Sequence, residues 1–469
     1  MRRLYVIVGV AAVAGLLAVP SPGSGNRTPS TRPIRTSIYL AGEDLRRSNL
    51  EIALRRVRAA GATAVRFALV WASIAPTKPA NAADPNDPAY NWEAADREIS
   101  LARRYGLDPH VTLYYAPRWA GGTRTDPRQF GLFARAAARR YSGSFQGLPR
   151  VRVWMAWNEP NLRRYLSPQF QRRRLVSTKR YAKMLNAFAQ SVHGVHRDNI
   201  VVGGLLAPLN GQHGAGALKF MRSIFCIARK GRHLVSTCRT RLQFDAWAIH
   251  PYTSGGPTHR AHGHDGAALG NLPDARAILR AAIRARHVKS SKRVRLWVTE
   301  FSWDSKPPDP LGVPIRLETR WVAEALYRTW KAHVPLLTWL QLRDMPRRTN
   351  PYQAGLYYRG RSYAKARPKP VLKAFQFPFV AHRSPRSFFV WGRTPKSDAR
   401  SVSIQLSRGR GWKRIATVRA NANGVFFRTF HRKSKPSWFL RAQLAGKGGT
   451  SRRFSLRPVP DRYYPAFGS

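Results

Sequence analysis

The 469-residue sequence is short of acidic side chains and of cysteine. It has 23 Asp and Glu against 82 Lys and Arg, which gives a formal net charge of +59. Its two cysteines do not by themselves make a metal site, and their spacing fits no zinc pattern. No glycine-rich phosphate loop follows the first predicted strand, which argues against a dinucleotide-binding fold. We therefore predict no metal and no cofactor.

The excess of positive charge runs through the whole chain, with local clusters such as 172–174. A charge this large attracts anionic polymers, membranes or nucleic acid over a long range. No arginine-rich block is interleaved with aromatic residues, as is typical of nucleic-acid grooves, so we expect no specific nucleic-acid partner. Two explanations remain: a general preference for arginine on solvated surfaces, and electrostatic binding to acidic cell-wall or extracellular polymers.

The sequence has one long apolar run, at residues 4–20, with two arginines before it and small or helix-breaking residues after it. This order is typical of a secretory signal, although the run also approaches the roughly 17 residues that a membrane span needs. We predict that residues 1–25 are a signal peptide or an N-terminal anchor, that 26–35 are a linker, and that the protein is secreted or extracytoplasmic. Cys226 and Cys238 agree with export, because an oxidising compartment favours a disulfide across so short a segment.

Downstream of the linker, apolar strands alternate with amphipathic helical stretches. Strands are predicted at 36–40, 63–71, 109–115, 151–157, 200–204, 244–252, 295–303 and 336–341. Helices are predicted at 45–60, 92–105, 130–141, 179–196, 274–286, 317–333 and 369–375. Eight strands separated by helices are the repeat of a (β/α)8 barrel, so the fold class is α/β with a TIM barrel over residues 36–376. A doubly wound open sheet would give the same alternation. We consider it less well supported than the barrel, because no glycine-rich loop follows the first strand.

Past residue 380 the pattern changes to short, closely spaced strands without helices, separated by turn residues such as 421–424. This pattern predicts a small all-β antiparallel sandwich over residues 380–469. Its aromatic residues are expected to form a core. The alternative is that they bind carbohydrate.

Two of the predicted barrel strands end on a glutamate. The 151–157 strand stops at an Asn-Glu-Pro sequence that contains Glu159, because proline cannot continue a strand ladder. The strand that begins at Arg295 runs into Glu300. A carboxylate at the end of an apolar strand is costly to desolvate unless it has a partner or a function. Barrels of this kind hold their chemistry at the carboxyl ends of strands, and paired carboxylates are what glycoside hydrolysis requires.

Trp157-Asn-Glu-Pro160, Trp297-Val-Thr-Glu300 and His250-Pro-Tyr252 together resemble the clan of retaining glycoside hydrolases with (β/α)8 barrels (clan A), in particular the family 39 enzymes or the cellulase-like family 5. The resemblance covers residues 36–376. It implies that Glu159 is the general acid/base and Glu300 the nucleophile of a double displacement. Substrate-binding residues are expected near the strand ends: Asn158, Arg66, Tyr252, His250, Tyr114, Trp119, Trp303 and Trp339.

Some of these roles follow from the resemblance one by one. Asn158 would hold the sugar 2-hydroxyl, Arg66 would orient the nucleophile, and Tyr252 would donate a hydrogen bond to it. Trp339 would form the platform under the reacting sugar. Each tryptophan taken singly is equally well explained by packing in the barrel.

The sequence therefore predicts a retaining glycoside hydrolase of the EC 3.2.1 type that cleaves β-glycosidic bonds of a poly- or oligosaccharide. A different class stays open beside it. The barrel could be a catalytically inactive protein that binds polysaccharide or attaches to a cell surface, using its basic field to bind acidic polymers.

Overall fold

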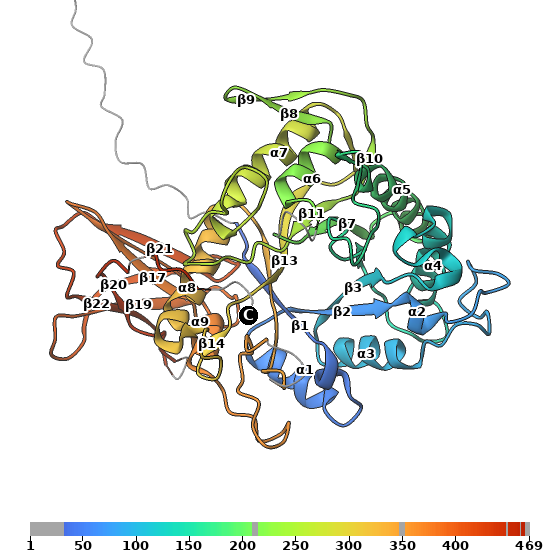
Figure 1. Cartoon of the computed structure of the whole chain (residues 1–469). Coiled ribbons are helices and arrows are strands. Elements are labelled where there is room, and N and C mark those ends of the chain that lie inside the picture. The colour runs from blue at the N-terminus through green and yellow to red at the C-terminus, as the bar shows by residue number, and fades with distance from the viewer. Residues whose placement is uncertain (1–31, 209–213, 347–351, 447–448, 460, 465–469) are drawn as a thin grey trace, which may run out of the picture. The chain divides into compact units, whose positions relative to one another are not determined.

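The computed structural model describes residues 32–208, 214–346, 352–446, 449–459 and 461–464. Eight parallel strands close into a barrel, and the last strand pairs with the first. Helices surround the barrel strands (Figure 1). In order around the barrel the strands are β1 (Arg35–Tyr39), β2 (Ala64–Val70), β3 (Asp108–Tyr114), β4 (Val153–Ala156), β7 (Ile200–Leu206), β11 (Ala246–Ile249), β13 (Arg295–Phe301) and β16 (Leu336–Trp339). The predicted (β/α)8 barrel is confirmed.

Helices alternate with the strands and bury one apolar face each. The helices are α1 (Leu50–Ala59), α2 (Trp71–Ile74), α3 (Glu93–Arg104), α4 (Pro127–Arg140), α5 (Ser177–Val195), α6 (Ala217–Ile224), α7 (Leu272–Arg284), α8 (Ile315–Lys331) and α9 (Pro370–Gln376). Helix α4 shows why such a segment starts where it does. The side chain of Asp126 accepts hydrogen bonds from two free backbone N–H groups, and proline occupies the first turn, where it loses no hydrogen bond.

The region between β7 and β11 differs most from the sequence-based expectation. Helix α6 was not predicted, because its eight residues are too few to show a clear helical period. A two-stranded hairpin follows it, made of β8 (Ile227–Lys230) and β9 (His233–Ser236). A disulfide between Cys226 and Cys238 closes this hairpin, with their Cα atoms 5.2 Å apart. The predicted disulfide is therefore present.

Residues 1–25, predicted to be a signal peptide or an anchor, lie outside the described residues. Within the described ranges, no helix combines the length and the apolar character needed to cross a bilayer.

The C-terminal region forms two antiparallel sheets, as predicted from its short strands. One sheet contains β17 (Phe379–Arg383), β18 (Phe388–Arg393) and β21 (Val425–Phe430). The other contains β20 (Lys413–Arg419), β19 (Ser401–Ser407), β22 (Phe439–Leu444) and β23 (Phe454–Ser455). Strands β19 and β22 bury alternate residues, whereas β18 is buried along most of its length. The described aromatic residues of this region include core residues such as Phe388 and Phe430, whose rings stack 4.6 Å apart.

One arginine of the C-terminal region is tied to the barrel. Arg393, at the end of β18, is fully buried and donates hydrogen bonds to the carbonyl of Ile34 (3.0 Å) and to Oγ1 of Thr36 (3.2 Å). It also donates to the carbonyl of Phe375 in α9, at 3.4 Å. A buried guanidinium is costly without partners, so these bonds fix the C-terminal region against the first strand of the barrel.

Candidate active site

Glu159 enters the barrel mouth from a distorted turn after β4. The strand ends at Ala156, and the backbone of Trp157 and Glu159 adopts positive φ angles of 76° and 44°. Such angles are uncommon for residues other than glycine, and they cluster at functional sites. The N–H of Glu159 donates to the carbonyl of Leu205 in β7, at 3.0 Å, which holds the turn in place.

Glu300, near the end of β13, is held by an arginine of β2, from which it is separated by β1 and β16. Arg66 of β2 is fully buried and donates hydrogen bonds to Oε1 of Glu300 and to the carbonyl of Thr299. Its other nitrogens donate to Oγ1 of Thr112 and to Oδ1 of Asn158, both at 3.0 Å. The same guanidinium therefore orients the carboxylate of Glu300 and the amide of Asn158.

Hydrogen bonds and positive charge keep Glu300 ionised. Burial alone would raise the pKa of Glu300, but the charges of His250 and Arg66 and the hydrogen bonds from Arg66 and Tyr252 outweigh it and lower the pKa below its usual value. The hydroxyl of Tyr252 donates to Oε2 of Glu300 at 3.0 Å. Burial and the charge of Glu300 raise the pKa of Tyr252 well above its usual value, so this hydroxyl keeps its proton.

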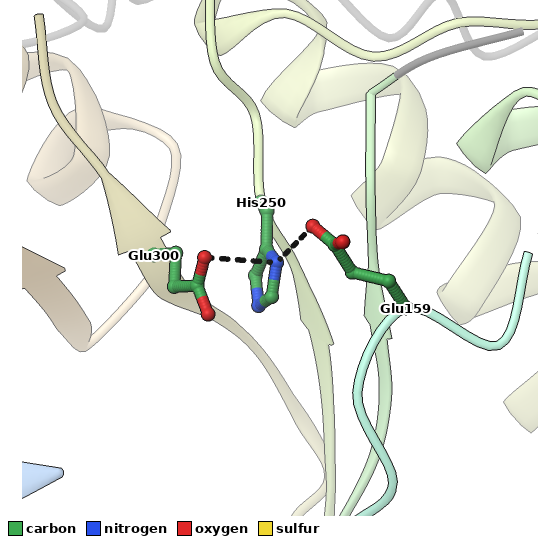
Figure 2. A group of neighbouring side chains, drawn as sticks. All are labelled: Glu159, His250 and Glu300. Carbon is green, nitrogen blue, oxygen red and sulfur yellow. Dashed lines mark hydrogen bonds and ion pairs between the residues drawn. The ribbon is translucent and has the colours of Figure 1, made fainter. Parts of the chain in front are cut away.

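His250 lies between the two carboxylates (Figure 2). Its Nδ1 is 3.0 Å from Oε1 of Glu159 and 3.5 Å from Oε2 of Glu300. Its Nε2 is 3.1 Å from Oγ1 of Thr299, and the ring is fully buried. The imidazole therefore links the two glutamates and fixes the orientation of the Glu159 carboxyl group.

A cavity of about 340 Å³ opens above these groups. Five of the residues singled out in the sequence line it: Tyr114, Asn158, Glu159, Tyr252 and Glu300. Arg66 and His250 lie beneath its floor, where they contact the glutamates but do not line the cavity. Oδ1 of Asn158 accepts from Arg66, whereas its amide nitrogen has no hydrogen-bond partner among the described residues.

The three predicted tryptophans lie outside this cavity. None of Trp119, Trp303 and Trp339 is among the described residues that line it. Their indole N–H groups all donate to backbone carbonyls at 2.9 Å, of Ala75, Gly255 and Ala354 respectively. Trp303 and Trp339 are buried and pack against Phe301 at ring distances of 4.6 and 6.2 Å. These contacts fit packing in the barrel and give the platform role of Trp339 no support.

Tyrosines take the place of tryptophan in the cavity wall. Besides Tyr114 and Tyr252, the described lining includes Tyr39, Tyr165 and Tyr352. Tyr39 ends β1 and could have been found by the strand-end argument that identified the others. Tyr165 and its neighbour Arg164 belong to the loop after β4, where the sequence carries no periodic signal. The guanidinium of Arg164 lies over the ring of Tyr165, 4.8 Å from its centroid.

The two glutamates and His250 could also be considered as metal ligands. One ligand atom of each lies within 4.8 Å of the others. However, the guanidinium of Arg66 donates directly to Glu300, and a second cation beside it would be repelled. The donor set therefore fits carboxylate chemistry better than metal binding.

Comparison with known proteins places the fold. No protein-family model and no curated protein matches this sequence. The structure is similar to a family 39 glycoside hydrolase from the gut symbiont Bacteroides cellulosilyticus WH2, with a TM-score of 0.52, 15% identity, and 86% of this chain and 81% of that chain covered. It is also similar to a monomeric beta-xylosidase from Caulobacter crescentus CB15, with a TM-score of 0.50, 13% identity, and 88% and 96% of the two chains covered.

These likenesses concern the fold: the (β/α)8 barrel and the β sheets that follow it are arranged as in a family 39 glycoside hydrolase and a beta-xylosidase. The predicted resemblance is confirmed at the level of the fold. Of the two families considered, family 39 is the one to which the Bacteroides cellulosilyticus enzyme belongs.

Proposed function

We propose that this protein is a retaining glycoside hydrolase that cleaves β-glycosidic bonds of an oligo- or polysaccharide, with Glu159 as general acid/base and Glu300 as nucleophile. The observation that carries the proposal is the arrangement of the two carboxyl groups. They come from the ends of β4 and β13 and face each other across His250 at the floor of one cavity.

The spacing of the carboxyl groups supports the retaining mechanism. One oxygen of Glu159 and one of Glu300 lie within 4.8 Å of each other. Retaining enzymes hold their carboxyl groups about 5–5.5 Å apart, whereas inverting enzymes need about 6.5–9.5 Å to admit a water molecule between carboxylate and sugar.

The contacts of each glutamate suit its proposed role. In the first step, an oxygen of Glu300 attacks the anomeric carbon, the bond to the leaving oxygen breaks, and Glu159 gives its proton to that oxygen. Arg66 and Tyr252 keep Glu300 ionised for this attack. In the second step, a water molecule gives a proton to Glu159, and the oxygen of that water attacks the anomeric carbon. The bond between the anomeric carbon and Glu300 breaks, so Glu159 is again protonated and Glu300 again ionised.

Asn158 and the similar structures add further support. Asn158 lies in the cavity wall, and we propose that its amide nitrogen donates to the sugar 2-hydroxyl, a contact that strengthens at the transition state. The similar structures are a family 39 glycoside hydrolase and a beta-xylosidase. A carbohydrate substrate and an EC 3.2.1 type of activity follow for this chain if it shares their chemistry as well as their fold. The disulfide fits an extracytoplasmic protein, and we extend this to secretion.

The test is covalent trapping of the intermediate. Incubation with a panel of 2-deoxy-2-fluoro glycosyl fluorides, followed by mass spectrometry of the intact protein and peptide mapping, is expected to place the adduct on Glu300. Fluoride leaves without protonation, so Glu159→Ala is expected to form the same adduct but to release it more slowly, because the base that activates water is missing.

Two matched variants complete this experiment. Glu300→Gln is expected to form no adduct, whereas Glu98→Gln, which changes another buried glutamate away from the cavity, is expected to label like the wild type. An adduct on a different residue would refute the assignment. Binding of a polysaccharide without turnover of any β-glycoside, unchanged in Glu159→Gln, would favour the inactive binding protein instead.

A further inference from the structure

A second cavity, of about 440 Å³, lies at the opposite end of the barrel from the glutamates. Arg295, which begins β13, is part of its wall, whereas Glu300 stands five residues further along the same strand. A strand rises about 3.3 Å per residue, so the two positions are roughly 17 Å apart along it. The two cavities share no lining residue. We call this second site the basic cavity.

Basic side chains surround the basic cavity: Arg276, Arg280, Lys292, Arg293, Arg295 and His333. Lys292 is the one that has a carboxylate partner among the described residues, since its Nζ lies 3.4 Å from Asp245. All 23 Asp and Glu of the chain are among the described residues. None of these carboxylates lies within 4.0 Å of any of the four arginines, the distance that defines an ion pair. The guanidinium groups of the four arginines also donate no hydrogen bond to a described residue.

The four arginines repel one another. Arg276 and Arg280 are one turn apart on the same face of α7, and Arg293 and Arg295 are two residues apart where β13 begins. Burial and then the charges of Arg280 and Arg32 lower the pKa of Arg276. Within the described part of the chain none of the four arginines has a carboxylate within 4.0 Å, and the nearby Asp108 and Asp245 line the adjoining cavity that Arg293 and Arg295 share. An anionic ligand bound between the arginines would relieve their repulsion.

The shape and lining of the basic cavity indicate which anion it fits. It is concave, whereas a bilayer presents a flat surface. Among the described residues its lining includes no Phe, Tyr or Trp, on which the bases of a single-stranded nucleic acid would stack. Between the basic side chains lie the apolar residues Leu279, Val294 and Leu296. Apolar surface of this kind suits the C–H face of a sugar ring, and the arginines suit its carboxylate or sulfate groups.

We propose that the basic cavity is a binding site for acidic saccharides, that is, for sugar chains that carry carboxylate or sulfate groups. It is separate from the catalytic cavity and does not depend on the proposed glycosidase activity. Its effect would be to hold the protein on an acidic matrix by one end of the barrel while the opposite end remains open to substrate. Part of the net charge of +59 would then bind a ligand at one defined site.

The test uses isothermal titration calorimetry of the full chain with oligogalacturonate and with heparin oligosaccharides, at 50 to 200 mM salt. The variant replaces four arginines of the basic cavity with glutamine: Arg276, Arg280, Arg293 and Arg295. The matched control replaces four exposed arginines outside the basic cavity that have no ion pair with a described residue: Arg47, Arg104, Arg128 and Arg135. Both proteins lose the same net charge, so a difference between them reports the site and not the overall field.

The basic-cavity variant is expected to bind at least tenfold more weakly at 50 mM salt. By analogy with flexible polyanions, the slope of log affinity against log salt is expected to fall by about 3, and by less than 1 in the control. The melting temperature of the variant is expected to stay or rise, because repulsion is removed, which separates lost binding from lost folding.

Three results would overturn the proposal. The first is that neither acidic saccharide binds the wild type at 50 mM salt. The second is that the control loses as much affinity as the variant. The third is that vesicles with phosphatidylserine or single-stranded DNA bind more tightly than both saccharides and depend on the same four arginines.

Discussion

The hydrogen bond from Tyr252 to Glu300 allows a quantitative test of the proposed nucleophile. Tyr252→Phe removes only the hydroxyl that donates to Oε2 of Glu300 at 3.0 Å. A hydrogen bond to a charged group contributes about 1.5–3 kcal/mol, and one pKa unit corresponds to about 1.4 kcal/mol. The loss should therefore raise the pKa of Glu300 by about 1–2 units.

The effect has a definite sign in the pH profile of kcat/KM. The nucleophile must be ionised, so the acid limb of the profile reports its pKa in the free enzyme. Since the pKa of Glu300 is lowered in the wild type, its acid limb should lie at low pH. In Tyr252→Phe the limb should move to higher pH by about 1 unit or more, measured with an aryl β-glycoside that the wild type hydrolyses.

Tyr114→Phe is the matched control for this prediction. It removes a hydroxyl from the same cavity, and no hydrogen bond joins that hydroxyl to Glu300 in the described structure. Its acid limb should stay where it is in the wild type. An acid limb that does not move in Tyr252→Phe, or that moves equally in both variants, would refute the assignment of Glu300 as the group that must be ionised.

Two further predictions concern stability. Burial raises the pKa of Glu318 to about 8 from 4.5, so ionisation of this group costs stability progressively from pH 4.5 up to pH 8. The free energy of unfolding of Glu318→Gln should therefore equal that of the wild type near pH 4 and exceed it at pH 8 by on the order of 3–5 kcal/mol. Thermal unfolding across pH measures this difference. A difference that does not change with pH would contradict the prediction. Opening the Cys226–Cys238 bridge, which spans 12 residues, with Cys226→Ser and Cys238→Ser should cost about 3 kcal/mol in urea unfolding and leave turnover unchanged at 25 °C. Lost turnover in a folded double variant would contradict the second prediction.

Residues at the strand ends could be placed from the sequence because their positions are fixed by strand order. A charged residue inside an apolar strand, such as Arg66 or Glu300, needs a buried partner, and the structure provides each with the other. His250 and Tyr252 follow β11 with a spacing of two, and both contact the glutamates.

Aromatic side chains at the same strand ends could not be placed in this way. A tryptophan that packs outward against a helix and one that lines a cavity give the same sequence pattern, as Trp339 shows. Cavity residues from loops, such as Arg164 and Tyr352, were missed because a loop has no periodicity. Their positions depend on tertiary contacts that the sequence does not display.

The bonds of Arg393 have a consequence for the order in which the protein is made. Ile34 and Thr36 lie at the start of β1, yet Arg393, which binds them, is synthesised 359 residues after Ile34. The partner strand of β1 that closes the barrel, β16, is also among the last barrel segments to be made. The barrel of a growing chain therefore stays open until β16 (Leu336–Trp339) has been translated, and the bonds of Arg393 form later still. Contacts of such long range form slowly.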